Sequence, residues 1–304
     1  STPSNSSAAS DVYKRQIHTI DIMVDNEKFM TAQTKYLLEF QPDIVWATGP
    51  QDPLMMITWE PCQVKIPGYN WEADPDEVIQ VIEKEIMKEE DYEYAYENGY
   101  IKLLIKLLPK LRPDMPRARE KFLEGLKKPS VVGATNIQSN IETFRKLGFT
   151  VYWGGGFESP FSCLSYLRSY QKICLDLYRN PDVISRVIEK FLPEMVKGSI
   201  DTCKLLGIPR AIIGLHRESS SFFSLKIFEE ILLPEIKKIV ELHSKEGIIT
   251  VLHMDGNWTP NLPYLRELPK RTCVIQIDED TDPFKAKEIL GDRQCIDAGP
   301  MELR

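Results

Sequence analysis

The chain has 304 residues, of which 42% are hydrophobic and 27% charged, which suits one large α/β domain or two small ones. Its net charge of -7 and pI of about 5.4 provide no broad basic face, so we expect no nucleic-acid partner. The apolar runs are far shorter than the roughly 20 residues that cross a bilayer, so we expect no membrane partner either. The six cysteines are scattered and form no CxxC pair, which is typical of reduced thiols in a cytoplasmic protein.

Both ends of the sequence differ from its interior. Residues 1–16 are rich in Ser and Ala, and they end in a hexapeptide, DVYKRQ, that looks like a translated sequencing adapter. We interpret residues 1–16 as a non-native segment and residues 17–304 as the folded domain. The chain also stops at Arg304 directly after a strand-like segment, so we expect the natural product to continue beyond both ends.

Hydrophobic periodicity predicts the elements of the first half. In chain order they are a helix at Asn26–Phe40, a strand at 43–49, a charged helical stretch at 74–111, strands at 130–134 and 150–153, and helices at 163–178 and 183–206. The glycines at 154–156 are interpreted as a tight turn.

The second half alternates strands and helices more regularly. The predicted order is strand 211–215, helix 225–245, strand 248–253, helix 262–268, strand 273–278, helix Pro283–Leu290 and strand Cys295–Ala298. This alternation indicates parallel βαβ units. Neither GxGxxG nor GxxxxGK[ST] follows a predicted strand, which disfavours a nucleotide-binding doubly wound sheet. The sequence therefore predicts an α/β fold, a (β/α)8 TIM-type barrel truncated at both ends.

Polar side chains follow four of the predicted strands. They stand at 158–159, 216–219, 253–257 and 278–282. Catalytic residues of such barrels lie at the C-terminal ends of the strands, so we expect these groups to line one cavity. The alternative for each of them is a solvated loop residue.

His253 and Asp255 form the sharpest local pattern. Residues two apart on a strand project to the same side, so the imidazole and the carboxylate could bind one metal ion. The alternative is a hydrogen-bonded histidine followed by Asp255 or Asn257 as a helix cap. Cys295 could supply a thiolate or could pack in the core.

Several stretches together resemble the uroporphyrinogen decarboxylase superfamily. They are HMDGNW at 253–258, DEDTD at 278–282, ESPF at 158–161 and FEE at 228–230. The resemblance runs from about Met30 to Arg304 and is densest after Thr150. It implies one of two chemistries on a barrel. Porphyrinogen decarboxylases remove carboxylates from a tetrapyrrole without metal, whereas their cobamide-dependent relatives use zinc to bind a methyl acceptor and exchange methyl with a corrinoid protein.

The resemblance also has departures. The zinc-using relatives carry His-x-Cys where this chain has His253 and Asp255, and their third ligand, a late cysteine, would lie beyond Arg304. Cys295 is therefore not the family's ligand by position, only a candidate for a substitute ligand. The decarboxylases carry an aspartate near the position of Thr48, which this chain lacks, while a family tyrosine matches at Tyr166.

The methyltransferase branch is our leading hypothesis. The chain would move a methyl group between a corrinoid, supplied by a partner protein, and a thiol or other small acceptor, with zinc as metal. The alternatives are a metal-free carboxy-lyase acting on a tetrapyrrole, with Arg217 as an anion clamp, and a barrel that only binds a corrinoid or tetrapyrrole. The expected site consists of catalytic Asp255, Asp278 and Tyr166, substrate-binding Glu158, His216, Arg217, Asn257 and Asp282, and metal ligands His253, Asp255 and Cys295.

Overall fold

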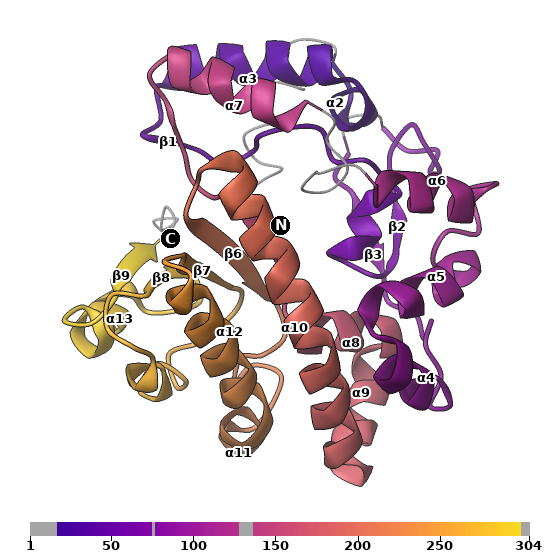
Figure 1. Cartoon of the computed structure of the whole chain (residues 1–304), viewed down its shortest axis with the longest axis vertical. Coiled ribbons are helices and arrows are strands. Elements are labelled where there is room, and N and C mark those ends of the chain that lie inside the picture. The colour runs from indigo at the N-terminus through magenta and orange to yellow at the C-terminus, as the bar shows by residue number, and fades with distance from the viewer. Residues whose placement is uncertain (1–16, 75–76, 128–135, 299–304) are drawn as a thin grey trace. The chain divides into compact units, whose positions relative to one another are not determined.

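The computed structural model describes residues 17–74, 77–127 and 136–298, and the chain forms two compact units (Figure 1). The first unit comprises Ser1–Ile86 and Leu104–Tyr152, and the second Met87–Leu103 and Trp153–Arg304. The predicted non-native segment at 1–16 and the predicted strand at 130–134 lie outside the described residues. Within the described part, no helix is both long enough and apolar enough to cross a membrane.

The first unit is mainly helical with two small sheets. Helix α3 (Asn26–Phe40) matches its predicted bounds, because Asp25 accepts the backbone N–H groups of Glu27 and Lys28 as an N-cap. The other elements are α2 (Thr19–Val24), η1 (Met55–Thr58), α6 (Ala118–Gly125), α7 (Ile137–Lys146), the parallel pair β1 (Ile44–Val45) and β4 (Thr150–Val151), and the antiparallel pair β2 (Gln63–Lys65) and β3 (Gln80–Ile82).

The predicted helical stretch at 74–111 is wrong in its first half. Strand β3 occupies part of it, and the helix that follows is divided into α4 (Asp91–Asn98) and α5 (Tyr100–Leu111). Gly99 separates the two helices with a φ of 82°. L-residues with a side chain rarely adopt that φ, so the division depends on the glycine.

The second unit contains a five-stranded sheet in which neighbouring strands are parallel. Its order is β5 (Gly155–Glu158), β6 (Arg210–Leu215), β7 (Ile249–Met254), β8 (Cys273–Ile277) and β9 (Cys295–Ala298). Between the strands lie α8 (Pro160–Arg168), α9 (Tyr170–Arg179), α10 (Pro181–Leu206), α11 (Leu225–Ile227), the π-helical turn η2 (Phe228–Leu232), α12 (Leu233–Lys245), η3 (Tyr264–Glu267) and α13 (Pro283–Leu290). The predicted parallel α/β architecture is confirmed. The described strands follow one another in chain order, as in a barrel, and closure of a barrel stays a prediction.

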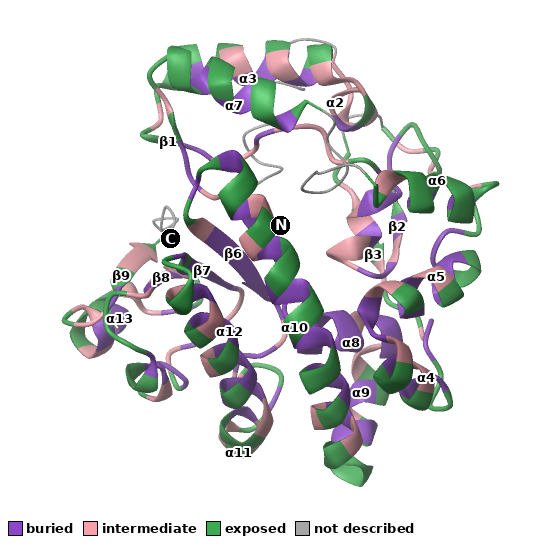
Figure 2. Cartoon of the chain, viewed as in Figure 1, coloured by how far each residue is buried: buried purple, intermediate pink, exposed green. Residues whose placement is uncertain are grey.

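The core of the second unit lies between the sheet and its long helices. Helix α10 packs on β5, and α12 packs on β7. Figure 2 shows β6 as buried and α10 with alternating buried and exposed residues. Because parallel strands covered by helices are buried on both faces, they appear in the sequence as continuous apolar runs. That is why strands β6 and β7 were predictable.

Three predictions in the second unit are corrected by the structure. Gly155 and Gly156 belong to strand β5 rather than to a tight turn, because the strand backbone lies close against α10. A Cβ atom at Gly155 would lie 2.4 Å from the carbonyl oxygen of Ser199. The predicted helix at 163–178 is interrupted at Ser169, which has a φ of 71°. The predicted helix at 262–268 is only the short 3-10 turn η3, which ends where Pro269 forces Leu268 into an extended conformation.

Candidate active site

The C-terminal ends of three neighbouring strands place two carboxylates and an imidazole together. Glu158 is the last residue of β5, His216 follows β6 directly, and Asp255 follows β7 directly. Parallel strands end at the same edge of a sheet, so these side chains meet there. His253 lies two residues before Asp255, within β7, and faces the same group.

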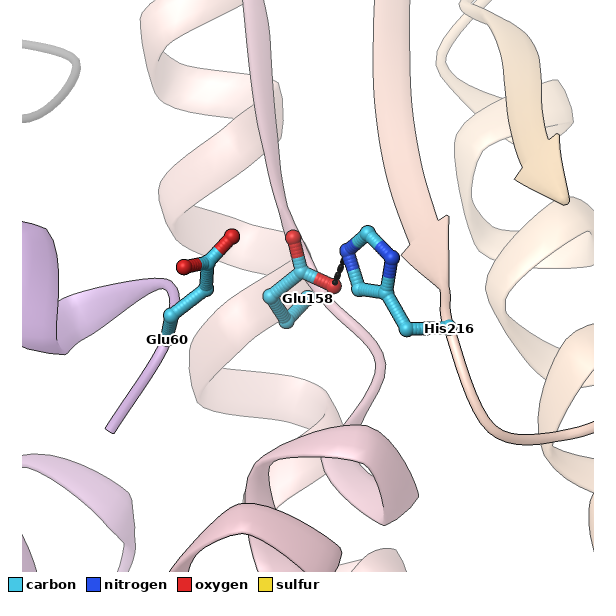
Figure 3. Close-up of side chains that lie close together, drawn as sticks. All are labelled: Glu60, Glu158 and His216. Carbon is cyan, nitrogen blue, oxygen red and sulfur yellow. Dashed lines mark ion pairs between the residues drawn. The ribbon is translucent and has the colours of Figure 1, made fainter. Parts of the chain in front are cut away.

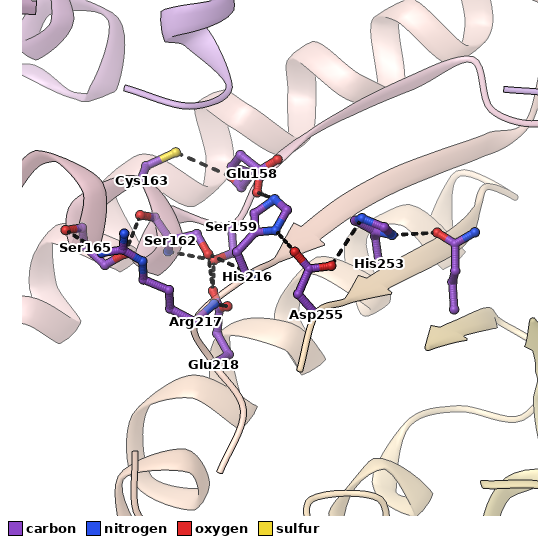
Figure 4. Close-up of polar contacts among 11 residues, drawn as sticks. Glu158, Ser159, Ser162, Cys163, Ser165, His216, Arg217, Glu218, His253 and Asp255 are labelled. Atoms are coloured by element: carbon purple, nitrogen blue, oxygen red, sulfur yellow. Dashed lines mark hydrogen bonds and ion pairs between the residues drawn. The ribbon is translucent and has the colours of Figure 1, made fainter. Parts of the chain in front are cut away.

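His216 lies between the two carboxylates. Its Nε2 atom forms an ion pair with Glu158 Oε2 at 2.8 Å (Figure 3), and its Nδ1 atom lies 2.5 Å from Asp255 Oδ2. The second oxygen of Asp255, Oδ1, lies 3.4 Å from His253 Nε2, so Asp255 contacts both imidazoles (Figure 4). The result is a continuous polar path from β5 through β6 to β7.

The charges of this group follow from its geometry. Burial alone would lower the pKa of His216, but the Glu158 carboxylate and the hydrogen bond with Asp255 outweigh it and raise that pKa well above its ordinary value. Burial likewise opposes ionisation of Asp255, yet its hydrogen bond with His216 lowers its pKa. At neutral pH, His216 is therefore a buried imidazolium that is paired with a carboxylate on each side.

Gly214 makes room for the Glu158 carboxylate. The two residues are register partners on β6 and β5, and an ideal Cβ at Gly214 would lie 2.0 Å from Glu158 Oε2. Any side chain at this position would displace the carboxylate from His216. The absence of a side chain at Gly214 is thus a requirement of the site.

A second buried carboxylate holds the backbone beside His216. Glu218 accepts the hydroxyl hydrogens of Ser159 and Ser162 and the backbone N–H of Arg217. Ser159 is also the N-cap of α8, where it accepts the N–H of Ser162. Glu218 therefore ties the loop after β6 to the start of α8, and its pKa is raised by burial.

Arg217 and Tyr166 lie beside His216. The guanidinium group of Arg217 stands 4.5 Å from the centre of the Tyr166 ring, which itself lies 6.3 Å from the His216 ring. The guanidinium group also donates to the backbone carbonyl of Ser165 at 3.4 Å. Stacking of this kind holds the cation in place while leaving it partly exposed at the strand ends.

The remaining predicted polar residues make contacts within the neighbouring loops. Asp278 accepts the N–H of Gly256 at 2.6 Å, Asp282 is the N-cap of α13, and the side chain of Asn257 accepts the N–H of Thr259. These bonds fix the loops after β7 and β8. Catalytic or substrate-binding roles for the three residues stay predictions.

Comparisons with known proteins identify the family of the chain. The family model described as "Uroporphyrinogen decarboxylase (URO-D)" matches residues 109–297, which is more than half of the chain. The chain belongs to the uroporphyrinogen decarboxylase family. Members of this family are enzymes. No curated protein sequence matches the chain significantly.

The fold is shared with a solved methyltransferase. A structure named "methyltransferase from Methanosarcina mazei" matches with a TM-score of 0.59 and 14% sequence identity. The match covers 95% of this chain and 73% of the other. At that identity the similarity establishes the fold.

The structure does not bring Cys295 to the histidine and the carboxylate. Cys295 is exposed and pairs with Val274 in the sheet, whereas His253 pairs with Gln276, which pairs in turn with Asp297. Asp297 is the residue of β9 that stands level with His253, and Cys295 precedes it by two residues, or roughly 7 Å along the strand.

Gln276 and Asp297 are polar site residues that sequence reasoning missed. His253 Nδ1 lies 2.7 Å from Gln276 Oε1, and Gln276 Nε2 donates to Asp297 Oδ2 at 2.8 Å. The available signal was one polar residue within each of two otherwise apolar strands. Only the strand register shows that both stand level with His253.

His253 and Asp255 fit two ligand positions of a zinc ion. Nitrogen and oxygen ligands at tetrahedral zinc lie about 3.3 to 3.5 Å apart, given metal–ligand distances of about 2.0 to 2.2 Å. The separation of His253 Nε2 and Asp255 Oδ1 is 3.4 Å. Among the described residues, no further His, Cys, Asp or Glu brings a ligand atom within 4.8 Å of both atoms.

Proposed function

We propose that this member of the uroporphyrinogen decarboxylase family is a methyltransferase in which His253 and Asp255 hold a zinc ion. The methyl group would pass between a corrinoid, carried by a partner protein, and a thiol or another small acceptor. The observation that carries the proposal is the separation of 3.4 Å between His253 Nε2 and Asp255 Oδ1, at the strand ends of a fold shared with a methyltransferase.

Zinc bound at this pair would lower the pKa of a coordinated thiol and present it as a thiolate, the nucleophilic form. The chain's own residues would prepare the site. His216 holds Asp255 through Oδ2 and leaves Oδ1 facing His253. Arg217, held over the Tyr166 ring, places a cation beside His216, where it can bind an acidic group of the acceptor or of the corrinoid.

Metal content provides the first test. The full chain, purified without chelator, is expected to bind about one zinc ion per molecule in competition with a chromophoric chelator. His253→Ala should abolish this binding, whereas His18→Ala, outside the pair, should leave it unchanged. Equal zinc binding by the His253→Ala chain would show that the zinc ion is bound elsewhere in the protein, and would overturn the proposal.

Turnover provides the second test. With methylcobalamin and a simple thiol, the zinc-loaded chain should transfer the methyl group to the thiol, so the absorbance of the methyl–cobalt species should fall. With the His253→Ala chain this absorbance should stay unchanged. Release of CO₂ from a tetrapyrrole by a chain without metal would instead establish the carboxy-lyase. Tight binding of a corrinoid or tetrapyrrole without any turnover would establish a binding barrel.

A further inference from the structure

A row of three polar side chains crosses strands β7, β8 and β9. His253 pairs with Gln276, and Gln276 pairs with Asp297, so the three residues stand at one level of the sheet. Adjacent strands lie about 4.8 Å apart, so Asp297 is roughly 10 Å from the backbone of β7, and Gln276 connects it to His253.

Asp297 determines which way the Gln276 amide faces. Its carboxylate offers only acceptor atoms, so the end of the amide that it contacts must be the NH₂ group. The observed contact is Gln276 Nε2 to Asp297 Oδ2 at 2.8 Å. The opposite orientation would place two oxygen acceptors against each other, so the carbonyl oxygen is directed toward β7.

The Gln276 oxygen in turn determines the hydrogen position on His253. The Gln276 Oε1 atom lies 2.7 Å from His253 Nδ1, and an amide oxygen can only accept. Nδ1 must therefore carry the hydrogen. In a neutral ring the lone pair is then on Nε2, which lies 3.4 Å from Asp255 Oδ1, a longer contact than the 2.7 Å at Nδ1. Because a carboxylate oxygen is also only an acceptor, the contact at Nε2 becomes favourable when a cation lies between the two atoms.

We propose that Gln276 and Asp297 are positioning residues that hold His253 in its Nδ1–H tautomer and direct the Nε2 lone pair toward Asp255. Metal-ligating histidines generally donate the hydrogen of their other ring nitrogen to a partner that fixes the ring. The metal in this statement rests on the proposed function, whereas the orientation of His253 does not.

The tautomer can be measured in metal-free protein. Long-range ¹H–¹⁵N spectra of the full chain, labelled at histidine and recorded at about pH 9, where an ordinary imidazole is neutral, distinguish Nδ1–H from Nε2–H. His253→Ala assigns the signal. The unsubstituted chain is expected to show Nδ1–H at His253, and Gln276→Leu, which removes the acceptor at similar volume, should shift the ring to Nε2–H.

Two further variants separate positioning from simple packing. Asp297→Asn has the same shape but no longer forces the amide orientation, so it should give a mixture of both tautomers. The double variant Gln276→Glu with Asp297→Asn exchanges the carboxylate and the amide, and it again offers His253 only an acceptor, so it should restore Nδ1–H. His243, whose ring contacts Ser199 and Thr250, provides an unchanged reference signal in every spectrum.

Metal affinity tests the consequence. Zinc binding by Gln276→Leu should be weaker by roughly 10- to 100-fold, the usual effect of removing such a partner, with recovery in the double variant. An Nε2–H ring in the unsubstituted chain, or no change in Gln276→Leu, overturns the inference whether or not zinc binds. The expected tautomers in a chain that binds no zinc would uphold the positioning and refute only the proposed function.

Discussion

Replacement of Gly214 by alanine tests the geometry of the site without removing any of its polar groups. The added Cβ would lie 2.0 Å from Glu158 Oε2, 2.4 Å from its Cδ and 2.5 Å from Oε1. Real Cβ contacts are at least 3.0 Å, so the carboxylate must withdraw by about 1 Å. Glu158 is only 4% exposed and ends a paired strand, so it has no open space to enter.

The cost follows from two effects. Overpacking a closed interior by one methyl group costs about 1 to 3 kcal/mol. Separating a buried ion pair costs about 3 to 5 kcal/mol when one charge is left alone. His216 keeps Asp255 as its second partner, so the loss should be smaller than that of a fully broken pair. We therefore expect Gly214→Ala to lower the free energy of unfolding by about 3 kcal/mol, where the two ranges meet.

Urea unfolding at pH 7 measures this quantity through the transition midpoint. Gly198→Ala is the matched control, because Gly198 lies within α10 and nothing stands within 4 Å of its ideal Cβ. That change should stabilise the chain by about 0.5 to 1 kcal/mol, since it only restricts the unfolded state.

A double-mutant cycle identifies the cause of the loss. In a Glu158→Ala background the added methyl group meets no carboxylate, so Gly214→Ala should cost little there. A cost of the same size in both backgrounds would refute the reasoning. A single variant as stable as the unsubstituted chain would refute it as well.

Two further predictions concern the pH dependence of stability. Burial lowers the pKa of His243 to about 4. Between pH 6.5 and 4 the unfolded chain therefore binds a proton at this residue that the folded chain does not, and the free energy of unfolding should fall by up to about 3 kcal/mol over that range. The His243→Gln chain should lack this component in urea titrations, and an equal acid loss in both chains would contradict the assignment. The pKa of His216 is raised instead, against the effect of its burial, by the flanking carboxylates. The stabilisation from His216 should be complete below about pH 6.5 and should be lost as the pH rises toward the folded pKa, with a slope of up to about 1.4 kcal/mol per pH unit that is absent in His216→Gln.

The sequence predicted the second half of the fold better than the first because its elements carry simple patterns. Strands β6 and β7 are mostly buried, largely apolar runs. Helix α10 begins after Asn180 and ends before Gly207, and both residues are visible as helix signals. Strand β5 was missed because Gly155 and Gly156 have no side chains to form a pattern. Their place in the sheet is determined by the close approach of α10, which is a tertiary contact.

The site was predictable to the level of the strand ends and no further. Polar residues after successive parallel strands indicated that Glu158, His216 and Asp255 share one edge of the sheet. Which carboxylate contacts which ring depends on the register between strands, and sequence spacing does not contain it. Gln276 was missed for the same reason, because its partner His253 stands on another strand.

The aspartate at position 255 and the histidine at position 216 are chemically linked. A carboxylate has two oxygen atoms that can accept a hydrogen bond or bind a metal, and here Oδ2 contacts His216 while Oδ1 faces His253. A thiolate at the same position would offer one donor atom and could not serve both rings. Asp255→Cys would thus present sulfur to a metal held by His253 but would leave the buried imidazolium with Glu158 as its remaining ion-pair partner among the described residues. His216 and His253 of this chain therefore together favour aspartate over cysteine at position 255.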